Sequence, residues 1–243
     1  MADQLREQLH IRLEGLRQEG VWALRRRLEA EPSVAEDTAP EAAAGPVSSP
    51  PRSAGLGTAE PLGKIAVEAS SCTACQLSEQ RRNVVFGVGN PRARLMFIGE
   101  GPGRDEDLQG EPFVGRAGQV LDRIIVAMGL EREHVYIANA VKCRPPRNRN
   151  PQPDELAACR HFLLRQVAAI DPEVIVLLGR VAMQAVLEVE APLGRMRGRF
   201  HDWNGVPVMC TYHPAYLLRN PADKRKVWED IQQVMGLLAD SPA

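Results

Sequence analysis

Three polar residues, Glu100, Asn139 and His213, each stand at or just beyond the end of an apolar run, where they could take part in chemistry. A carboxylate can accept a proton, an amide can donate and accept hydrogen bonds at once, and an imidazole can do either near neutral pH. If the runs are parallel strands, their carboxyl ends meet at one edge of a sheet, where ligands bind in open α/β proteins. Each residue alone could simply stabilise a turn, but three at one edge indicate a binding or catalytic site.

The five cysteines form a second group with chemical potential. Cys72 and Cys75 are separated by two residues, Cys143 lies in a basic loop, and Cys159 lies on the helix expected after that loop. Four thiolates without a histidine fit either a zinc ion or a [4Fe–4S] cluster, and their spacing does not distinguish the two. Cys210 stands in an apolar run and is expected to be a core residue.

The segment between the first strand and the next helix has the composition of a ligand-binding turn. Its GEGPG sequence, Gly99–Gly103, allows the backbone to come close to a ligand, and one aromatic residue, Phe113, follows. A dinucleotide site is disfavoured because three acids follow the glycines, Pro102 interrupts them, and the next helix is expected to begin too late to offer its amides to a phosphate. These features suit a flat, neutral heterocycle better.

Apolar runs and helical patterns alternate along the second part of the chain, which indicates an α/β protein. We expect a three-layer α/β/α fold around a central, mostly parallel, four-stranded sheet. The expected strands cover residues 95–98, 135–139 and 174–178 and a last strand that runs toward residue 212 after a hairpin turn at Asn204–Gly205. The expected helices begin near residues 120, 154, 180 and 222.

The chain is predicted to have two parts. Residues 1–63 are expected to form a terminal helix and a linker rich in proline and alanine, and residues 64–243 a compact domain. The formal net charge is −1, so nucleic-acid binding would have to come from local basic patches. Without an apolar run of membrane-spanning length or a signal-peptide core, we expect a cytoplasmic protein that contacts no membrane.

Four motifs carry a resemblance to a known family. They are GEGPG at 99–103, EPFVGRAGQ at 111–119, NAVKCRPP at 139–146 and HPAYLLRNP at 213–221. With the four-cysteine pattern, they resemble the family 4 uracil-DNA glycosylases over roughly Ile65 to Ala239. The resemblance implies the fold of the uracil-DNA glycosylase superfamily, hydrolysis of the N-glycosidic bond of uracil in DNA, and a [4Fe–4S] cluster bound by Cys72, Cys75, Cys143 and Cys159.

The resemblance also implies roles for the residues at the sheet edge. Asn139 would distinguish uracil from cytosine, Phe113 would stack on the base, and His213 would stabilise the departing uracil anion. Because Gly101 stands where other branches have a water-activating aspartate, Glu100 and Glu106 join His213 as catalytic candidates. The predicted uracil-binding set is Glu100, Gly101, Pro102, Glu106, Phe113, Asn139 and His213, with Glu106 in the space of a thymine methyl group.

A base in a duplex must be flipped out to be cleaved, so an apolar wedge is expected in the loop after His213, which carries Tyr216, Leu217 and Leu218. The predicted DNA contacts are Arg144, Arg147, Tyr216, Leu217 and Arg219. We expect a monomer in the cytosol or nucleoid of a prokaryote. Two alternatives are a member of the cross-linking branch of the superfamily, disfavoured because no histidine lies between Gly103 and Glu111, and a DNA-binding module that has lost the chemistry.

Overall fold

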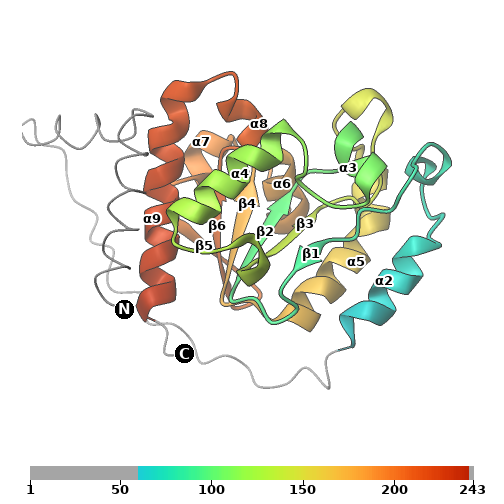
Figure 1. Cartoon of the computed structure of the whole chain (residues 1–243), viewed down its shortest axis with the longest axis horizontal. Coiled ribbons are helices and arrows are strands. Elements are labelled where there is room, and N and C mark those ends of the chain that lie inside the picture. Colours follow the sequence, from blue (N-terminus) through green and yellow to red (C-terminus); the bar gives the residue numbers. More distant parts are fainter. Residues whose placement is uncertain (1–59, 241–243) are drawn as a thin grey trace, which may run out of the picture. The chain divides into compact units, whose positions relative to one another are not determined.

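The computed structural model describes residues 60–240, and an α/β fold occupies this range (Figure 1). The prediction of a helix and linker over residues 1–63 concerns a segment almost entirely outside the described residues, and it stays a prediction. The sheet has six strands in the order β1-β3-β2-β4-β6-β5. Their bounds are β1 Val88–Gly89, β2 Leu95–Gly99, β3 Tyr136–Asn139, β4 Val174–Leu178, β5 Phe200–Trp203 and β6 Val206–Thr211.

The four central strands, β3, β2, β4 and β6, are parallel, as the sequence predicted. The turn at Asn204–Gly205 forms the expected hairpin, which adds β5 antiparallel to β6 at one edge. The two-residue strand β1 pairs antiparallel with β3 at the other edge. The sheet is therefore mixed, with a parallel centre of the predicted size and two short antiparallel strands beyond it.

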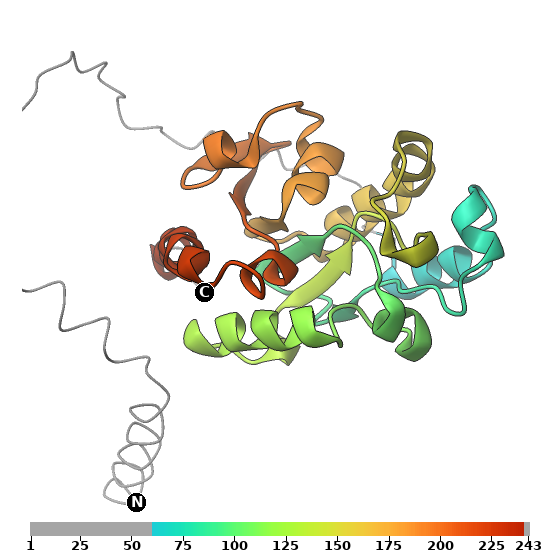
Figure 2. The ribbon, with the colours of Figure 1, turned by 90° about the horizontal axis from the view of Figure 1, so that it is seen from above.

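Helices cover both faces of the sheet (Figure 2). The α-helices are α2 Leu62–Ser70, α3 Arg104–Gln109, α4 Arg116–Ala127, α5 Pro153–Ile170, α6 Arg180–Leu187, α7 Leu193–Met196, α8 Pro214–Leu217 and α9 Lys224–Asp240. The short 3-10 helices are η2 Gln76–Glu79, η3 Arg132–His134, η4 Pro146–Asn148 and η5 Pro221–Asp223. No helix among residues 60–240 is long and apolar enough to cross a membrane.

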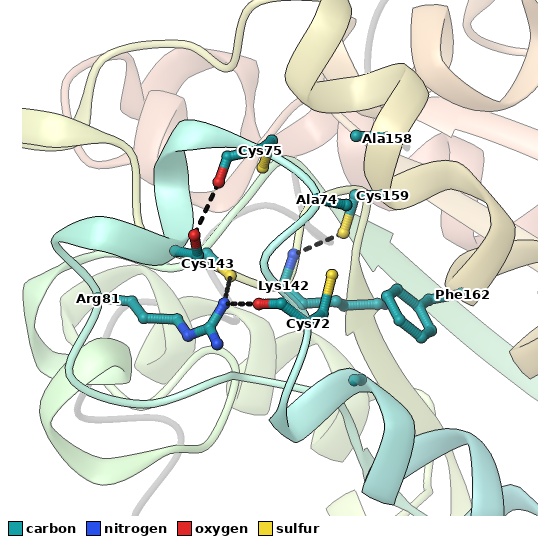
Figure 3. Close-up of a pocket in the computed structure, with 11 residues that line it drawn as sticks. Cys72, Ala74, Cys75, Arg81, Lys142, Cys143, Ala158, Cys159 and Phe162 are labelled. Atoms are coloured by element: carbon teal, nitrogen blue, oxygen red, sulfur yellow. Dashed lines mark hydrogen bonds between the residues drawn. The ribbon is translucent and has the colours of Figure 1, made fainter.

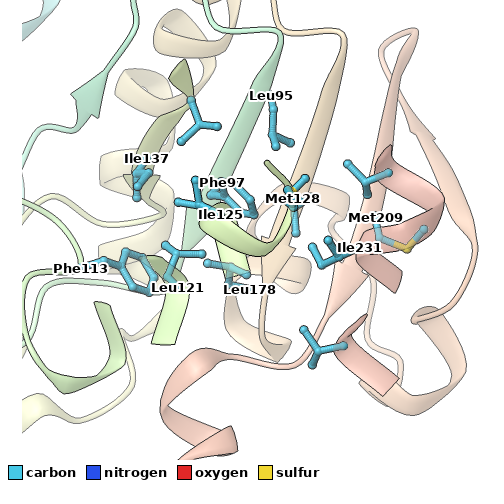
Figure 4. Close-up of a cluster of buried hydrophobic side chains, with 14 of the residues drawn as sticks. Leu95, Phe97, Phe113, Leu121, Ile125, Met128, Ile137, Leu178, Met209 and Ile231 are labelled. Atoms are coloured by element: carbon cyan, nitrogen blue, oxygen red, sulfur yellow. The ribbon is translucent and has the colours of Figure 1, made fainter. Parts of the chain in front are cut away.

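The central strands are buried on both faces because helices pack on each side. Along β2, Leu95 and Phe97 join one apolar cluster with α4 and α9, which Figure 4 shows. Met96 and Ile98 point to the opposite face and join a cluster with α5 and α6. This alternation follows from the two-residue period of a strand and explains why the strand sequences are apolar throughout.

Helix α3 corrects one sequence argument. We expected no helix to begin close behind the GEGPG turn, yet α3 starts at Arg104, directly after Gly103. Its N-terminus does not offer a free anion site, because the Glu106 carboxylate accepts a hydrogen bond from the Gly103 amide at 3.0 Å. The acidic residues after the turn thus form the first turn of a helix, where negative charge is favourable.

Candidate active site

The carboxyl ends of the parallel strands bring the predicted site residues to one edge of the sheet. Gly99 at the end of β2 pairs with Asn139 at the end of β3. Strand β6 ends at Thr211, and His213 follows as the residue that caps α8. The edge therefore gathers side chains from three segments that are distant in the sequence.

Asn139 is 1% exposed, and its side-chain oxygen Oδ1 has no hydrogen-bond partner. Within residues 60–240 the only other buried side-chain oxygen or nitrogen without a partner is Oε1 of Gln166. Leaving a buried acceptor unpaired costs about 1–3 kcal/mol, so such an atom needs an explanation. A ligand that donates a hydrogen bond to Asn139 would supply one.

Gly99 shows how closely the site residues approach one another. A Cβ atom on Gly99 would lie 2.4 Å from Asn139 Oδ1 and 2.5 Å from Cζ of Phe113. Both contacts are far shorter than van der Waals distance, so only glycine leaves room for the amide and the ring. The unpaired acceptor and the aromatic ring therefore lie over the same point of the backbone.

Phe113 is held in an unusual backbone conformation. Its φ angle is +53°, a left-handed value that is uncommon for a bulky side chain. The Glu106 carboxylate accepts hydrogen bonds from the amides of the next two residues, Val114 at 3.0 Å and Gly115 at 2.9 Å. Glu106 thus fixes the turn that presents Phe113. The Phe113 ring lies 5.5 Å from the ring of His213, centroid to centroid.

His213 is placed to donate a hydrogen bond from one ring nitrogen. Its Nδ1 accepts from the backbone amide of Ala215 at 3.1 Å, so Nδ1 carries no proton in this arrangement. Burial lowers the pKa of His213 to about 4, and the positive charge of Arg219 acts in the same direction. At neutral pH the ring is therefore uncharged, and its proton lies on Nε2.

The two carboxylates predicted as catalytic candidates differ in their surroundings. Glu106 is 9% exposed, and three backbone amides occupy its oxygens. Burial raises the pKa of Glu100, and the positive charge of Arg180 opposes that shift. Of the two, Glu100 has the carboxylate that is less committed to the protein backbone.

The four predicted ligand cysteines line one hollow beside the sheet, which Figure 3 shows. Cys72 and Cys75 come from the segment around η2, Cys143 from the loop after β3, and Cys159 from α5. Cys210 is fully buried in the core of the sheet, as predicted, and does not line the hollow.

Nitrogen donors point at two of the sulfur atoms. The Arg81 guanidinium donates to Cys143 Sγ at 3.3 Å, and the backbone amide of Lys142 donates to Cys159 Sγ at 3.3 Å. Burial raises the pKa of the Cys143 thiol and raises that of Cys159 to about 11. Among residues 60–240, no three His, Cys, Asp or Glu side chains are placed to hold a single metal ion.

With this geometry established, similarity to known proteins decides the family. Residues 86–232 match the family model of the uracil DNA glycosylase superfamily. The chain is 47% identical over 186 residues to the type-4 uracil-DNA glycosylase of Thermotoga maritima, which covers 74% of this chain and 97% of the relative. It is 44% identical over 191 residues to that of Saccharolobus solfataricus, covering 74% of this chain and 88% of the relative.

The chain belongs to the type-4 uracil-DNA glycosylases. It is also 32% identical over 149 residues to a type-5 uracil-DNA glycosylase of Pyrobaculum aerophilum, which covers 53% of this chain and 64% of that relative. The fold predicted from the sequence is thereby confirmed as that of the superfamily.

Two residues predicted to contact DNA in this type-4 glycosylase have partners within the protein: Leu217 is buried, and Tyr216 is half-buried. Leu217 is 2% exposed and belongs to the apolar core, so it cannot reach DNA in this conformation. The Tyr216 ring stacks on the Tyr212 ring with 4.9 Å between their centroids, and the Tyr216 hydroxyl donates to Asp223 at 2.6 Å. The neighbouring Leu218 is 40% exposed and is the apolar side chain that this loop presents to solvent. The one-turn helix α8 explains the difference, because the sequence pattern did not show which residue its single turn leaves outside.

The basic residues of the type-4 glycosylase fall into two groups, those exposed to solvent and those paired with buried carboxylates. Arg147 and Arg219 are exposed, and Arg144 is half-buried with a hydrogen bond to Asn148 at 2.6 Å. Arg149 is instead held by the buried Glu155, and Arg197 by the buried Asp230.

Sequence analysis gave no role to two further residues at the cysteine hollow, Arg81 and Lys142. The NAVKCRPP motif contains Lys142, but only the fold shows where its side chain points.

Proposed function

We propose that the chain removes uracil from DNA by hydrolysing its N-glycosidic bond, with the edge formed by Gly99, Phe113, Asn139 and His213 as the active site. As a type-4 uracil-DNA glycosylase, it is a hydrolase of N-glycosyl bonds that acts in DNA repair. The observation that best supports this site is the unpaired, buried Oδ1 of Asn139 beside the Phe113 ring. A flat base with an N–H donor on its edge satisfies both features.

Asn139 supports discrimination between uracil and cytosine. Uracil presents an N3–H donor beside the O4 acceptor, whereas cytosine presents an acceptor beside a donor. The unpaired Oδ1 can accept from N3–H, and the amide NH₂ of the same side chain can donate to O4. Cytosine would leave both groups of Asn139 facing groups of the same kind, at the cost of an unpaired buried amide.

Phe113 supplies the stacking surface in this proposal. Base stacking on an aromatic side chain contributes about 1–3 kcal/mol, and the rigid turn held by Glu106 reduces the loss of freedom on binding. The carboxylate of Glu106 closes the site between the GEGPG turn and Phe113, where it would meet the methyl group of thymine. Because its oxygens bind three amides, we assign Glu106 to exclusion and positioning and remove it from the candidates for a general base.

His213 stabilises the leaving group. Cleavage of the bond leaves positive charge on the sugar and negative charge on uracil, and a fixed donor at uracil O2 favours that charge separation. The uncharged ring can donate from Nε2 to uracil O2 while its Nδ1 accepts from the Ala215 amide, so the ring is held in place for this bond. Glu100, whose pKa is raised by burial, is the candidate for orienting or activating the attacking water. Backbone groups of Gly101 and Pro102 complete the proposed uracil site.

The four cysteines are proposed to hold a [4Fe–4S] cluster. Their side chains line one hollow, and two nitrogen donors point at sulfur atoms, as thiolate ligands require. The four thiols alone fit either zinc or a cluster, and similarity to the type-4 glycosylases favours the iron–sulfur cluster. When bound, the cluster would join η2, the loop after β3 and α5.

DNA contact is proposed along the rim of the same edge. Arg144, Arg147 and Arg219 are the proposed phosphate contacts, and Leu218 is the proposed wedge among the three residues expected for that role. We further propose that the protein acts as a monomer in the cytosol.

The test is a uracil-containing oligonucleotide incubated with the purified protein and then treated with alkali, which cuts only at abasic sites. We expect one alkali-dependent cut at the uracil position and free uracil in solution. An oligonucleotide with thymine at that position is the control. A stable protein–DNA adduct without free uracil would instead identify a cross-linking enzyme, and binding without a cut a DNA-binding module.

A further inference from the structure

Lys142 is a buried lysine that has no carboxylate partner in the described part of the chain. Its side chain is 1% exposed, and lysine is almost never fully buried unless it is paired. No ion pair of Lys142 with an aspartate or glutamate occurs within residues 60–240. An isolated buried ammonium is costly, so some other group must compensate its charge.

Two of the thiols lie next to Lys142. Its backbone amide donates to Cys159 Sγ at 3.3 Å, Cys143 is the next residue in the chain, and Lys142 is among the residues that line the cysteine hollow. Its ammonium also lies 5.9 Å from the centre of the Phe86 ring, a weak cation–π contact. When bound, four thiolates around an iron–sulfur core would carry net negative charge, and this charge would lie at the hollow that Lys142 helps to line.

The other end of Lys142 reaches the active site. Its Nζ donates to the backbone oxygen of Asn139 at 2.8 Å. Two further bonds hold the same segment, from Ala140 N to Gly99 O at 2.9 Å and from Val141 N to Glu100 O at 3.2 Å. The strand therefore ends in a short segment fastened to the GEGPG turn on one side and to the cysteine hollow through Lys142 on the other.

We infer that Lys142 is a positioning residue through which the cysteine-bound cluster sets the orientation of Asn139, the residue that reads uracil. The negative charge of the thiolate cluster holds the ammonium in the interior, and the ammonium holds the Asn139 carbonyl. The side chain of Asn139 then points its Oδ1 beside Phe113. The cluster so contributes to base recognition as well as to folding. This inference rests on the proposed function and adds a residue to it.

The alternative is that Lys142 only fills space in the apolar packing next to the cysteines. The variant Lys142→Met keeps the length of the side chain and removes its charge and its donors. The matched control is Ile65→Ala, which loosens the same apolar cluster on α2 without lining the hollow or bonding to Asn139. Space-filling alone would make both variants behave alike.

Four quantities are measured on the purified holoprotein: iron content, the reduction potential of the cluster, the affinity for free uracil in an NMR titration, and the melting temperature. For Lys142→Met we expect normal iron, a more negative potential because a nearby positive charge is lost, and uracil binding weakened by about tenfold. For Ile65→Ala we expect a lower melting temperature with the potential and the uracil affinity of the wild type.

Wild-type uracil affinity in Lys142→Met, or an equal loss in Ile65→Ala, would overturn the inference and leave the glycosylase function standing. If Lys142→Met does not retain iron, Lys142→Gln is measured instead, because its amide keeps a donor while the charge is lost. It should show the negative shift in potential with a smaller loss of uracil affinity, and wild-type values for both would overturn the inference. A wild-type protein that holds no iron or binds no uracil would contradict the proposed function itself.

Discussion

His213 allows the proposed chemistry to be tested with two substitutions. His213→Ala removes the ring and its Nε2 donor, and His213→Gln places an amide donor near the position of Nε2. Neither substitution alters Asn139 or Phe113, so the groups proposed to bind uracil stay in place. The two variants therefore separate stabilisation of the leaving uracil from binding of the base.

The expected size of the effect follows from the role of the donor. Loss of one fixed donor to a developing anion typically lowers the rate by about 10²–10³, or roughly 2.7–4 kcal/mol in the barrier. We expect that loss in His213→Ala, with little change in affinity for uracil-containing DNA, and a partial recovery in His213→Gln. Single-turnover kinetics with excess enzyme measures the cleavage step directly.

The pH dependence provides an independent check. Burial lowers the pKa of His213 to about 4, so the ring stays neutral and active above that pH, and its contribution is lost as the pH falls through about 4. Between the ordinary pKa near 6.5 and about 4, the unfolded chain binds a proton that the folded chain excludes. The stability of the wild type therefore decreases as the pH is lowered through that window. His213→Ala should lack this component of the acid destabilisation.

The interpretation of His213 has clear contrary outcomes. A wild-type cleavage rate in His213→Ala with weakened DNA binding would make His213 a positioning residue. If the cleavage rate of the wild-type protein fell as the pH was lowered through about 6.5, His213 would be protonated there, and its surroundings would not be holding the ring neutral. Either result would refute the assignment of a neutral Nε2 donor.

Three further predictions concern other parts of the protein. The purified protein should hold about four irons and four acid-labile sulfides, unchanged in Cys210→Ser and reduced in Cys75→Ser, as iron and sulfide assays will show. Gly99→Ala should lower uracil excision at least 10²-fold, because the new Cβ would lie 2.4 Å from Asn139 Oδ1, and strain of about 1–3 kcal/mol should appear in its melting curve. Leu218→Ala should slow excision from double-stranded but not from single-stranded DNA, whereas Leu217→Ala should cost about 2–5 kcal/mol of stability in denaturant unfolding. Equal effects of the two leucine substitutions on duplex excision would contradict the assignment of Leu218 as the wedge.

The sequence predicted the centre of the fold well, for a physical reason. Strands buried on both faces need continuous apolar residues, and the run Val174–Leu178 coincides with β4 for this reason. The turn at Asn204–Gly205 was equally clear, because Asn204 and Gly205 have φ angles of +53° and +81°, which these residue types favour. Strand β1 escaped notice because two residues carry no periodic pattern, and α3 because its charged sequence has no apolar stripe.

Within the candidate site, residue types predicted the groups but not their partners. The pattern singled out Glu106, but it could not show that three amides of two separate turns bind its carboxylate. It placed Lys142 in a basic loop, where an exposed side chain is the usual expectation, and the fold buries that side chain with its Nζ bonded to the Asn139 carbonyl. Such contacts depend on how distant segments meet, which no local pattern records.

The most direct test of the account is Asn139→Asp, assayed for excision of uracil and of cytosine from matched oligonucleotides. The substitution replaces the donor that faces uracil O4 with an acceptor and leaves the size of the side chain nearly unchanged. We predict that uracil excision falls by at least about 10²-fold, that weak excision of cytosine appears, and that iron content stays at the wild-type level. Uracil excision at the wild-type rate by an iron-loaded Asn139→Asp protein would show that Asn139 does not read the base.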